Sequence, residues 1–493
     1  MKLMTGICQS SHASGGLLQF FRQEKTPFEI IKNSAEYPVI FFDEIFPVWA
    51  YDYIRNGGVA FVCGADKWTF DFDSGFVSQA SLEYINLSCF GLDDTRIVST
   101  VSLFSADNCI GSFPLHENRI QRDDTVPGLY PVIIINKIGK GTLLYTGIPF
   151  FRLLTVEGST LRFEDQSHPM SERISSIDKN KLEIALRRIL ELCYKEAEFP
   201  LVRLWYYPNN ADSVFAFRID GEPMLPESSS ALAESAISAD LPYTIYISGE
   251  RNEHTEGAAK RILELSKSNE IGSHAFHHNL VDGFAQNREN LRNCEIWLAQ
   301  NGIPFQKVFA APRGMYSADL GRALDSLGYK HSSDFSLAVS SLPFFPMVAQ
   351  EQRGPLQLPV DSFNVLRYQK YCQETGLSPP SPTEILDIYL RLSEYKLANH
   401  LPILFFCHPA AFGMMSKEIY PDLVNFMRQK GVYPTTMIHF GDFWCKRDAS
   451  EYAAYFENNE LHIECDLSEE ISLYVTNTKV VRRIKGYSNP RTD

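Results

Sequence analysis

The sequence predicts an α/β protein of more than one domain, with a (β/α) barrel in its central part. Its 493 residues exceed the roughly 250 to 300 residues over which one hydrophobic core usually extends. Strand-like and helix-like patterns alternate along the chain, and this alternation favours parallel sheets covered by helices. We therefore expect an α/β domain over residues 1–198, a barrel over 199–448 and a small β appendage over 449–493.

The first 198 residues open with the pattern of a βαβ unit. Tyr37–Asp43 is predicted to be a buried strand, Val48–Arg55 a helix that ends at the following two glycines, and Val59–Cys63 a second strand. Two more strands joined by a glycine turn and one long helix are predicted over Tyr130–Asn136, Thr142–Thr146 and Lys179–Tyr194. A parallel sheet with covering helices follows from this order.

Two glycine-bounded strands in this region resemble the flavodoxin-like domains related to glutamine amidotransferases. They are Gly-Gly-Val-Ala-Phe-Val-Cys-Gly and Gly-Lys-Gly-Thr-Leu-Leu-Tyr-Thr-Gly. Cys63 stands where a nucleophile could be sought, but no Gly-x-Cys-x-Gly elbow surrounds it. We interpret Cys63 as a buried cysteine at a strand end, and the domain as a scaffold or assembly module that contacts a partner protein or a second copy of the chain.

Strand-like runs recur through the next 250 residues, with helical stretches between them, and this repetition suits a barrel. The runs are Val214–Ile219, Tyr243–Ile247, Val308–Ala311 and Ile403–Cys407. After residue 448 the pattern changes to two short strands, predicted over Leu461–Cys465 and Ile471–Val475.

Composition narrows the classes of partner. A formal net charge of −14 argues against nucleic acid and against anionic membrane surfaces, which both reward clustered Lys and Arg. No apolar run approaches the roughly 20 residues of a membrane helix, so we expect no membrane insertion. The ten cysteines are scattered singly, and the N-terminus has no secretory pattern, so we expect a reducing, cytoplasmic location.

Two segments end strand-like runs with residues that bind metals or transfer protons. Phe-Arg-Ile-Asp-Gly-Glu delivers Asp220 and Glu222 at the end of a strand, where barrel enzymes place their active sites. Gly-Ser-His-Ala-Phe-His-His places His274 and His278 four residues apart, so a helical turn would project both imidazoles from one face. Two histidines and a carboxylate form an open ligand set for a catalytic divalent metal.

Five short motifs, in order across about 250 residues, resemble the polysaccharide deacetylases of carbohydrate esterase family 4, also known for the NodB homology domain. Besides the two segments above, they are Phe-Ala-Ala-Pro-Arg-Gly-Met-Tyr, Leu-Gly-Tyr-Lys-His-Ser-Ser-Asp and Ile-Leu-Phe-Phe-Cys-His-Pro. The resemblance implies a distorted (β/α) barrel. It also implies a carbohydrate or other small substrate and a divalent metal, with zinc expected first and cobalt, nickel or manganese as alternatives.

The resemblance also implies roles for single residues. Asp220, His274 and His278 would hold the metal, and His408 would be the general acid. Leu404 would receive the acetyl methyl group, and the third and fourth motifs would line the substrate pocket through Pro312, Arg313 and Asp334.

The chain departs from the family pattern at two linked positions. The first motif usually has two adjacent aspartates, and Ile219 stands where the catalytic base would be. The third motif usually begins with an arginine that pairs with this base, and Ala310 stands in its place. Because a buried arginine is costly without its carboxylate, the paired loss is physically coherent.

Three explanations stay open at this point. Asp220 could be the catalytic base and Glu222 the metal ligand, as in relatives whose motif is Asp-x-Glu. Arg313, Asp334 or Asp361 could instead reshape the site and supply the base. Finally, the domain could bind without hydrolysing.

The expected function is a cytoplasmic, metal-dependent N-deacetylase acting on an amino sugar, such as a polysaccharide precursor. Hydrolysis of a cyclic amide or ureide, and an inactive carbohydrate-binding or assembly module, are the alternatives.

Overall fold

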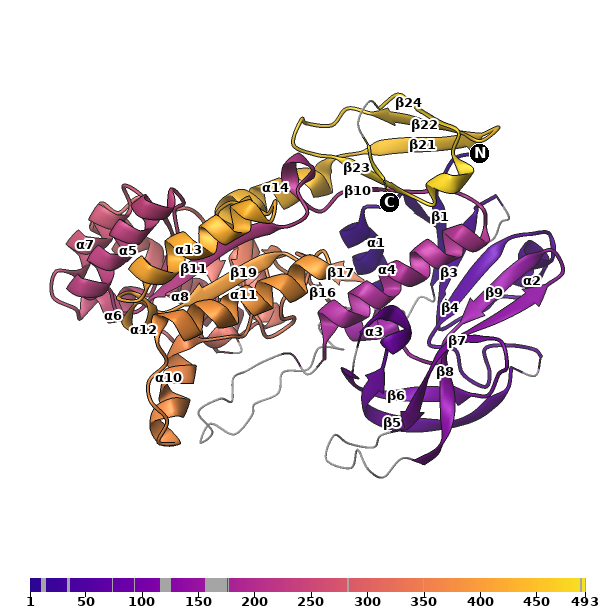
Figure 1. The fold of residues 1–493 in the computed structure, drawn as a ribbon, viewed down its shortest axis with the longest axis horizontal. Coiled ribbons are helices and arrows are strands. Elements are labelled where there is room, and N and C mark those ends of the chain that lie inside the picture. The colour runs from indigo at the N-terminus through magenta and orange to yellow at the C-terminus, as the bar shows by residue number, and fades with distance from the viewer. Residues whose placement is uncertain are drawn as a thin grey trace.

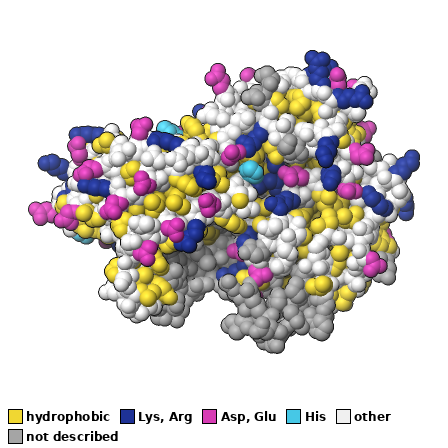
Figure 2. All heavy atoms as spheres, viewed as in Figure 1, with side chains coloured by type: hydrophobic (Ala, Val, Ile, Leu, Met, Phe, Trp, Pro, Cys, Tyr) yellow, Lys and Arg dark blue, Asp and Glu magenta, His cyan; other side chains and the backbone are white. Residues whose placement is uncertain are grey.

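The computed structural model describes residues 1–9, 15–32, 36–72, 74–92, 94–115, 126–155, 175, 177–281, 283–348, 350–487 and 490–492. The chain forms two α/β parts side by side, with the C-terminal strands lying across both (Figure 1). The predicted fold class is therefore confirmed. Lys and Arg side chains alternate with Asp and Glu over the face shown in Figure 2, as expected for a surface of mixed charge.

The N-terminal part is built on a sheet with the strand order β2-β1-β3-β4-β9-β8-β7. The strands β2, β1, β3, β4 and β9 are parallel to one another. With β9 counted as the fifth parallel strand, their order is 2-1-3-4-5, which is the order of flavodoxin-like folds, as predicted. The strands are β1 (Thr5–Gln9), β2 (Phe28–Ile30), β3 (Val39–Asp43), β4 (Val59–Cys63), β7 (Cys109–Leu115), β8 (Val126–Ile138) and β9 (Gly141–Tyr145). A separate hairpin pairs β5 (Phe76–Asn86) with β6 (Asp94–Phe104).

Helices cover both faces of this sheet. Side chains of α1, α3 and α4 share one core with Phe41 and Phe61, and α2 packs on the other face with Phe42 and Val62. The helices are α1 (Gly16–Glu24), α2 (Trp49–Arg55), α3 (Phe150–Leu154) and α4 (Lys179–Glu196). Successive apolar residues of β3 and β4 therefore pack into two hydrophobic cores, one on each face of the sheet.

The central part is a curled parallel sheet with the order β18-β15-β14-β13-β12-β11-β19. The chain directly after β18 joins the two edges: Leu358 N donates to Ser332 O of β15 (2.8 Å), and Asp361 N donates to Leu404 O of the opposite edge strand, β19 (2.9 Å). The strands are β11 (Val214–Gly221), β12 (Thr244–Ile247), β13 (Glu270–Ser273), β14 (Val308–Ala310), β15 (His331–Ser333), β18 (Leu356–Gln357) and β19 (Ile403–Cys407), and β20 (Tyr433–Pro434) pairs with the start of β11. Because the strands are parallel, their C-terminal ends meet at one end of the barrel.

Helices surround the barrel. They are α5 (Pro226–Ala239), α6 (Gly249–Glu253), α7 (Ala258–Leu265), α8 (Phe284–Gln300), α9 (Ala318–Ser326), α10 (Val365–Glu374), α11 (Pro382–Ala398), α12 (Pro409–Phe412), α13 (Ser416–Gln429) and α14 (Met437–Ala449). Along β11, Phe217 and Ile219 pack outward against helices, so Arg218 and Asp220 face the barrel interior. Within the described ranges, none of the helices combines the length and the apolarity needed to cross a bilayer.

The C-terminal strands pair with distant parts of the chain. β21 (Tyr452–Glu457), β22 (Glu460–Cys465) and β24 (Arg483–Lys485) form one sheet, while β23 (Leu473–Thr476) pairs with β10 (Leu201–Leu204) and β25 (Arg491–Thr492). A short β16 (Met347–Val348) and β17 (Glu351–Gln352) hairpin lies on the barrel side. The two predicted C-terminal strands correspond to β22 and β23.

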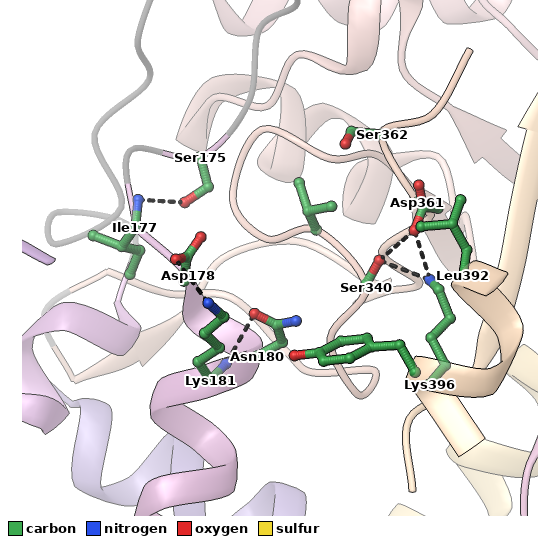
Figure 3. Close-up of a pocket in the computed structure, with 12 residues that line it drawn as sticks. Ser175, Ile177, Asp178, Asn180, Lys181, Ser340, Asp361, Ser362, Leu392 and Lys396 are labelled. Atoms are coloured by element: carbon green, nitrogen blue, oxygen red, sulfur yellow. Dashed lines mark hydrogen bonds and ion pairs between the residues drawn. The ribbon is translucent and has the colours of Figure 1, made fainter. Parts of the chain in front are cut away.

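A cavity of about 320 Å³ lies at the seam between the two α/β parts (Figure 3). The start of α4 lines one side, and the end of α11 with the loop at Asp361 lines the other. Lys396 lies 3.0 Å from Asp361 and donates to Ser340 Oγ at 2.7 Å, so the polar groups of this wall satisfy one another.

Candidate functional site

Strand β11 carries an arginine and an aspartate to the C-terminal end of the barrel. Arg218 and Asp220 form a fork, in which Nε lies 2.9 Å from Oδ1 and Nη2 lies 2.9 Å from Oδ2. Arg218 also donates through Nη1 to the backbone oxygen (2.6 Å) and the hydroxyl (2.8 Å) of Ser333 on β15. Both oxygens of Asp220 are thereby held in a fixed orientation.

Glu222 follows the end of β11, and three imidazoles surround one of its oxygens. Oε1 lies 3.0 Å from Nε2 of His278, 3.5 Å from Nε2 of His408 and 3.7 Å from Nε2 of His274. The other oxygen, Oε2, lies 3.2 Å from Nε of Arg251, whose side chain is about half exposed. The ends of β11, β13 and β19 thus converge on a single carboxylate.

The segment between the two predicted histidine ligands is not helical, so the predicted helical turn is wrong. The chain bends directly after His274, and Ala275 adopts a φ of +61°. Asn290 of α8 holds this loop, because its side chain donates to His277 O (3.0 Å) and accepts from His277 N (2.7 Å). The ring centres of His274 and His278 nevertheless lie only 5.2 Å apart.

The hydrogen bonds of His274 determine which ring nitrogen is available. Nδ1 lies 2.8 Å from the backbone oxygen of Ala310, so Nδ1 carries a proton, and in the neutral imidazole Nε2 offers the lone pair. Nε2 is buried and has no hydrogen-bond partner among the described residues. The ligand atoms of Glu222, His274 and His278 lie within 4.8 Å of one another. These three residues form a possible Glu/His/His metal site.

Buried charges set the protonation states of the site. Burial by itself would raise the pKa of Glu222, but the three histidines hold that pKa well below its usual range. Burial also opposes ionisation of Asp220, and the Arg218 guanidinium outweighs it and lowers the pKa. Burial lowers the pKa of His278, whereas Asp220 and Glu222 overcome burial and raise the pKa of His274. Both carboxylates are therefore anionic at neutral pH.

The predicted pocket residues lie in different surroundings. Leu404 is fully buried within the barrel, and Pro312 is buried beside Arg313, which is exposed and has a φ of +56°. Asp334 follows β15 and is buried, and this burial raises its pKa to about 7. Asp361 belongs to the seam cavity, where it pairs with Lys396. The assignment of Leu404, Pro312, Arg313 and Asp334 to a substrate pocket stays a prediction, as does the alternative in which Asp361 supplies the base.

The arginine that appeared to be missing is present on a different strand. The family pattern expects this arginine at the position of Ala310. The backbone oxygen of Ala310 instead accepts a hydrogen bond from His274. On β11 itself, Arg218 pairs with Asp220. Sequence reasoning missed both Arg218 and Arg251, although an arginine two residues before an aspartate in a buried strand shares its face and could have been recognised.

The family model described as polysaccharide deacetylase matches residues 212–332. This range contains β11 to β14 and the first two residues of β15, with Glu222, His274 and His278, and it ends before His408. The fold and the site define a (β/α) barrel with an open Glu/His/His cluster. Residues 212–332 match the polysaccharide deacetylase family, as the motifs in this range predicted. The amidotransferase likeness of the N-terminal part stays a prediction.

Solved structures show weaker likenesses. A Mycobacterium smegmatis protein described as a polysaccharide deacetylase is 15% identical, with a TM-score of 0.42 over 49% of this chain and 93% of its own. The carbohydrate deacetylase Agd3 is 11% identical, with a TM-score of 0.38 over 94% and 90%. The chitin deacetylase of Colletotrichum lindemuthianum is 16% identical, with a TM-score of 0.33 over 48% and 90%. No curated protein matches significantly in sequence.

Proposed function

We propose that the protein is a metal-dependent deacetylase that hydrolyses the N-acetyl amide of an amino sugar. The observation that carries this proposal is the convergence of His274, His278 and His408 on one oxygen of Glu222, at the C-terminal end of a polysaccharide deacetylase barrel. Barrel enzymes place their catalytic groups at this end of the strands.

We assign Glu222, His274 and His278 as the metal ligands. The donor set suits the site, because Nε2 of His274 is buried without a hydrogen-bond partner among the described residues and Oε1 of Glu222 lies 3.0 Å from Nε2 of His278. One carboxylate and two imidazoles suit zinc, and also cobalt, nickel or manganese. When bound, such an ion would acidify a water molecule and polarise the amide carbonyl.

Asp220 is the proposed general base, and this assignment replaces its predicted role as a ligand. Its two oxygens are engaged by Arg218, which orients the carboxylate and keeps it anionic. An ionised, fixed carboxylate beside the cluster can accept the proton that the attacking water loses. Arg218 therefore positions the base, and it performs the pairing that the family pattern assigns to another strand.

His408 is the proposed general acid. It stands directly after β19, with Nε2 3.5 Å from Glu222 and with Nδ1 buried. Once protonated, its imidazolium would deliver a proton to the departing amine of the sugar, which otherwise leaves poorly from a tetrahedral intermediate. Leu404, Pro312, Arg313 and Asp334 stay the proposed lining of the substrate pocket.

The reaction can be tested by acetate release from a panel of N-acetylated amino sugars, with protein reconstituted separately with zinc, cobalt, nickel and manganese. We expect hydrolysis with at least one ion and none after His274→Ala. His277→Ala is the matched control, because this half-exposed neighbour pairs with Glu250 outside the cluster. Absence of both metal and acetate release across the panel would overturn the proposal.

The same assay separates the alternatives. A ring-opened product without acetate would favour hydrolysis of a cyclic amide or ureide by the same residues. Sugar binding that survives both His274→Ala and His408→Ala, with no turnover in the parent, would favour a binding module. We place the reaction in the cytoplasm because all ten cysteines are free thiols. Cell fractionation tests this location.

A further inference from the structure

The N-terminal sheet ends in a row of three polar side chains, far from the barrel site in sequence. Gln9 of β1 is the register partner of Asp43 on β3, and Asp43 is the register partner of Cys63 on β4. Residues in register on neighbouring parallel strands project from the same face of the sheet. The three side chains therefore stand next to one another at the last rung of the strands, beyond the apolar row that includes Phe41 and Phe61.

The row lies at the topological switch point of the sheet. The chain passes from β1 to β2 on one side, and then crosses to β3 on the other side of β1. In open α/β sheets the crevice at such a reversal, outside the carboxyl ends of the strands, is where ligands bind. Gln9 and Asp43 are the last residues of β1 and β3, on the two strands between which this reversal occurs.

Two acceptors in the row lack donors. Asp43 is only 4% exposed, and no residue in the described part of the chain donates a hydrogen bond to its carboxylate or pairs with it. The side-chain oxygen of Gln9 is also buried without a partner. An unsatisfied buried carboxylate is costly, and such groups call for a partner that the described residues do not provide. Burial, with Glu44 nearby, raises the pKa of Asp43 to about 7.

The third member of the row is unsuited to covalent chemistry. Cys63 is fully buried, its Sγ lies 3.5 Å from Ile148 O, and burial together with Asp43 raises the pKa of the thiol. A nucleophilic cysteine needs a thiolate and access to its substrate. The row is therefore equipped to recognise a ligand and not to react with it.

We propose that Gln9 and Asp43 form a second binding site, which accepts hydrogen bonds from adjacent hydroxyl groups of a sugar ring. Neighbouring strands lie about 4.8 Å apart, a spacing over which two adjacent hydroxyls of one ring can donate to both acceptors. A free hexosamine and the ribose of a nucleoside share this chemistry. The site is independent of the metal cluster and of the proposed deacetylation.

The test is isothermal titration of full-length protein carrying His274→Ala, with glucosamine, N-acetylglucosamine and adenosine as separate probes. We expect one class of probe to bind, and we expect Asp43→Asn or Gln9→Leu to weaken its affinity about tenfold or more. Asp52→Asn is the control, because this exposed residue on α2 pairs only with Arg55 and should leave the affinity unchanged. Hexosamine binding identifies a saccharide site, and adenosine binding identifies a nucleoside site.

A second measurement covers the case in which a variant does not fold. In the unmutated chain, hydrogen–deuterium exchange should slow at the ends of β1 and β3 when the binding probe is added. Failure of all three probes to bind, or binding that neither variant weakens and that leaves exchange at these strand ends unchanged, would overturn the proposal. Neither result bears on acetate release at the barrel site.

Discussion

Two buried glutamates in this molecule are surrounded by cations of different kinds. Glu24, at the end of α1, has Arg187 Nε 3.2 Å from one oxygen and Arg203 Nη1 3.0 Å from the other, and Tyr206 donates to it as well. Glu222 has imidazoles around one oxygen and a half-exposed arginine near the other. Burial would raise both pKa values, and the neighbouring cations lower both.

The two sites differ in whether the cationic side chains around the glutamate can lose their protons. Guanidinium groups stay protonated at any ordinary pH, so the pairs around Glu24 are permanent and join α1 to α4 and to the linker strand β10. Imidazoles can give up their protons and offer lone pairs to a metal in place of hydrogen bonds to the carboxylate. A buried carboxylate among arginines therefore stabilises a fold, and one among histidines can bind a cation.

The largest expected effect concerns Asp220, the proposed base beside Glu222. Asp220→Asn should lower the rate of acetate release by a factor of about 10² to 10⁴, because the amide cannot accept the proton of the attacking water. Steady-state kinetics with the best acetylated substrate would show the loss in kcat. A variant that keeps most of its kcat would mean that the base is another residue.

Loss of the other glutamate should affect the fold. Glu24→Gln should lower the free energy of unfolding by about 3 to 5 kcal/mol, since it leaves Arg187 and Arg203 buried without their counter-charge. Urea unfolding of the full chain measures this, and Glu198→Gln, on the surface after α4, is the control. A change below about 1 kcal/mol would show that the arginines find other partners.

A third buried carboxylate extends the comparison, since Asp43 has neither arginine nor histidine partners. Its folded-state pKa of about 7 lies above the usual unfolded value, so the native state holds a proton that the unfolded state has lost between pH 4 and 7. Stability should therefore fall as the pH rises through this window, by an amount on the order of 4 kcal/mol. Asp43→Asn should remove this loss in unfolding curves recorded from pH 4 to 8. If the free energy of unfolding of Asp43→Asn depends on pH as it does in the unmutated chain, another group is responsible for the pH dependence.

The smallest expected effect is at Arg251, which pairs with Glu222. Because it is about half exposed, Arg251→Met should change the free energy of unfolding by less than about 1 kcal/mol. Metal affinity should change only a few-fold, as measured by competition with a chelator. A large loss of stability would show that the pair of Glu222 with Arg251 stabilises the fold, as the arginine pairs of Glu24 are proposed to do.

Much of the fold follows from local patterns. Val59–Cys63 and Ile403–Cys407 are continuous apolar runs, as expected of strands that are buried on both faces, and both form strands. The two histidines were found by spacing, but their conformation was not, because the bend at Ala275 depends on Asn290 from another helix.

Long-range pairings could not be read from the sequence. Glu24 and Arg187 are 163 residues apart, and no local pattern encodes their contact. The sequence also left open whether Asp220 or Glu222 is the metal ligand. Our proposal of Glu222 depends on two long-range features: Arg218 engages both oxygens of Asp220, and loops bring three histidines to Glu222.

The most direct test of this account is the metal content of two variants prepared side by side. Purified Asp220→Asn should retain about one tightly bound divalent ion per chain, while Glu222→Gln should lose it, with affinity reduced by at least about a hundredfold. Elemental analysis after dialysis against a weak chelator measures both. The reverse result, in which Asp220→Asn loses the ion and Glu222→Gln keeps it, would contradict the assignment of ligand and base.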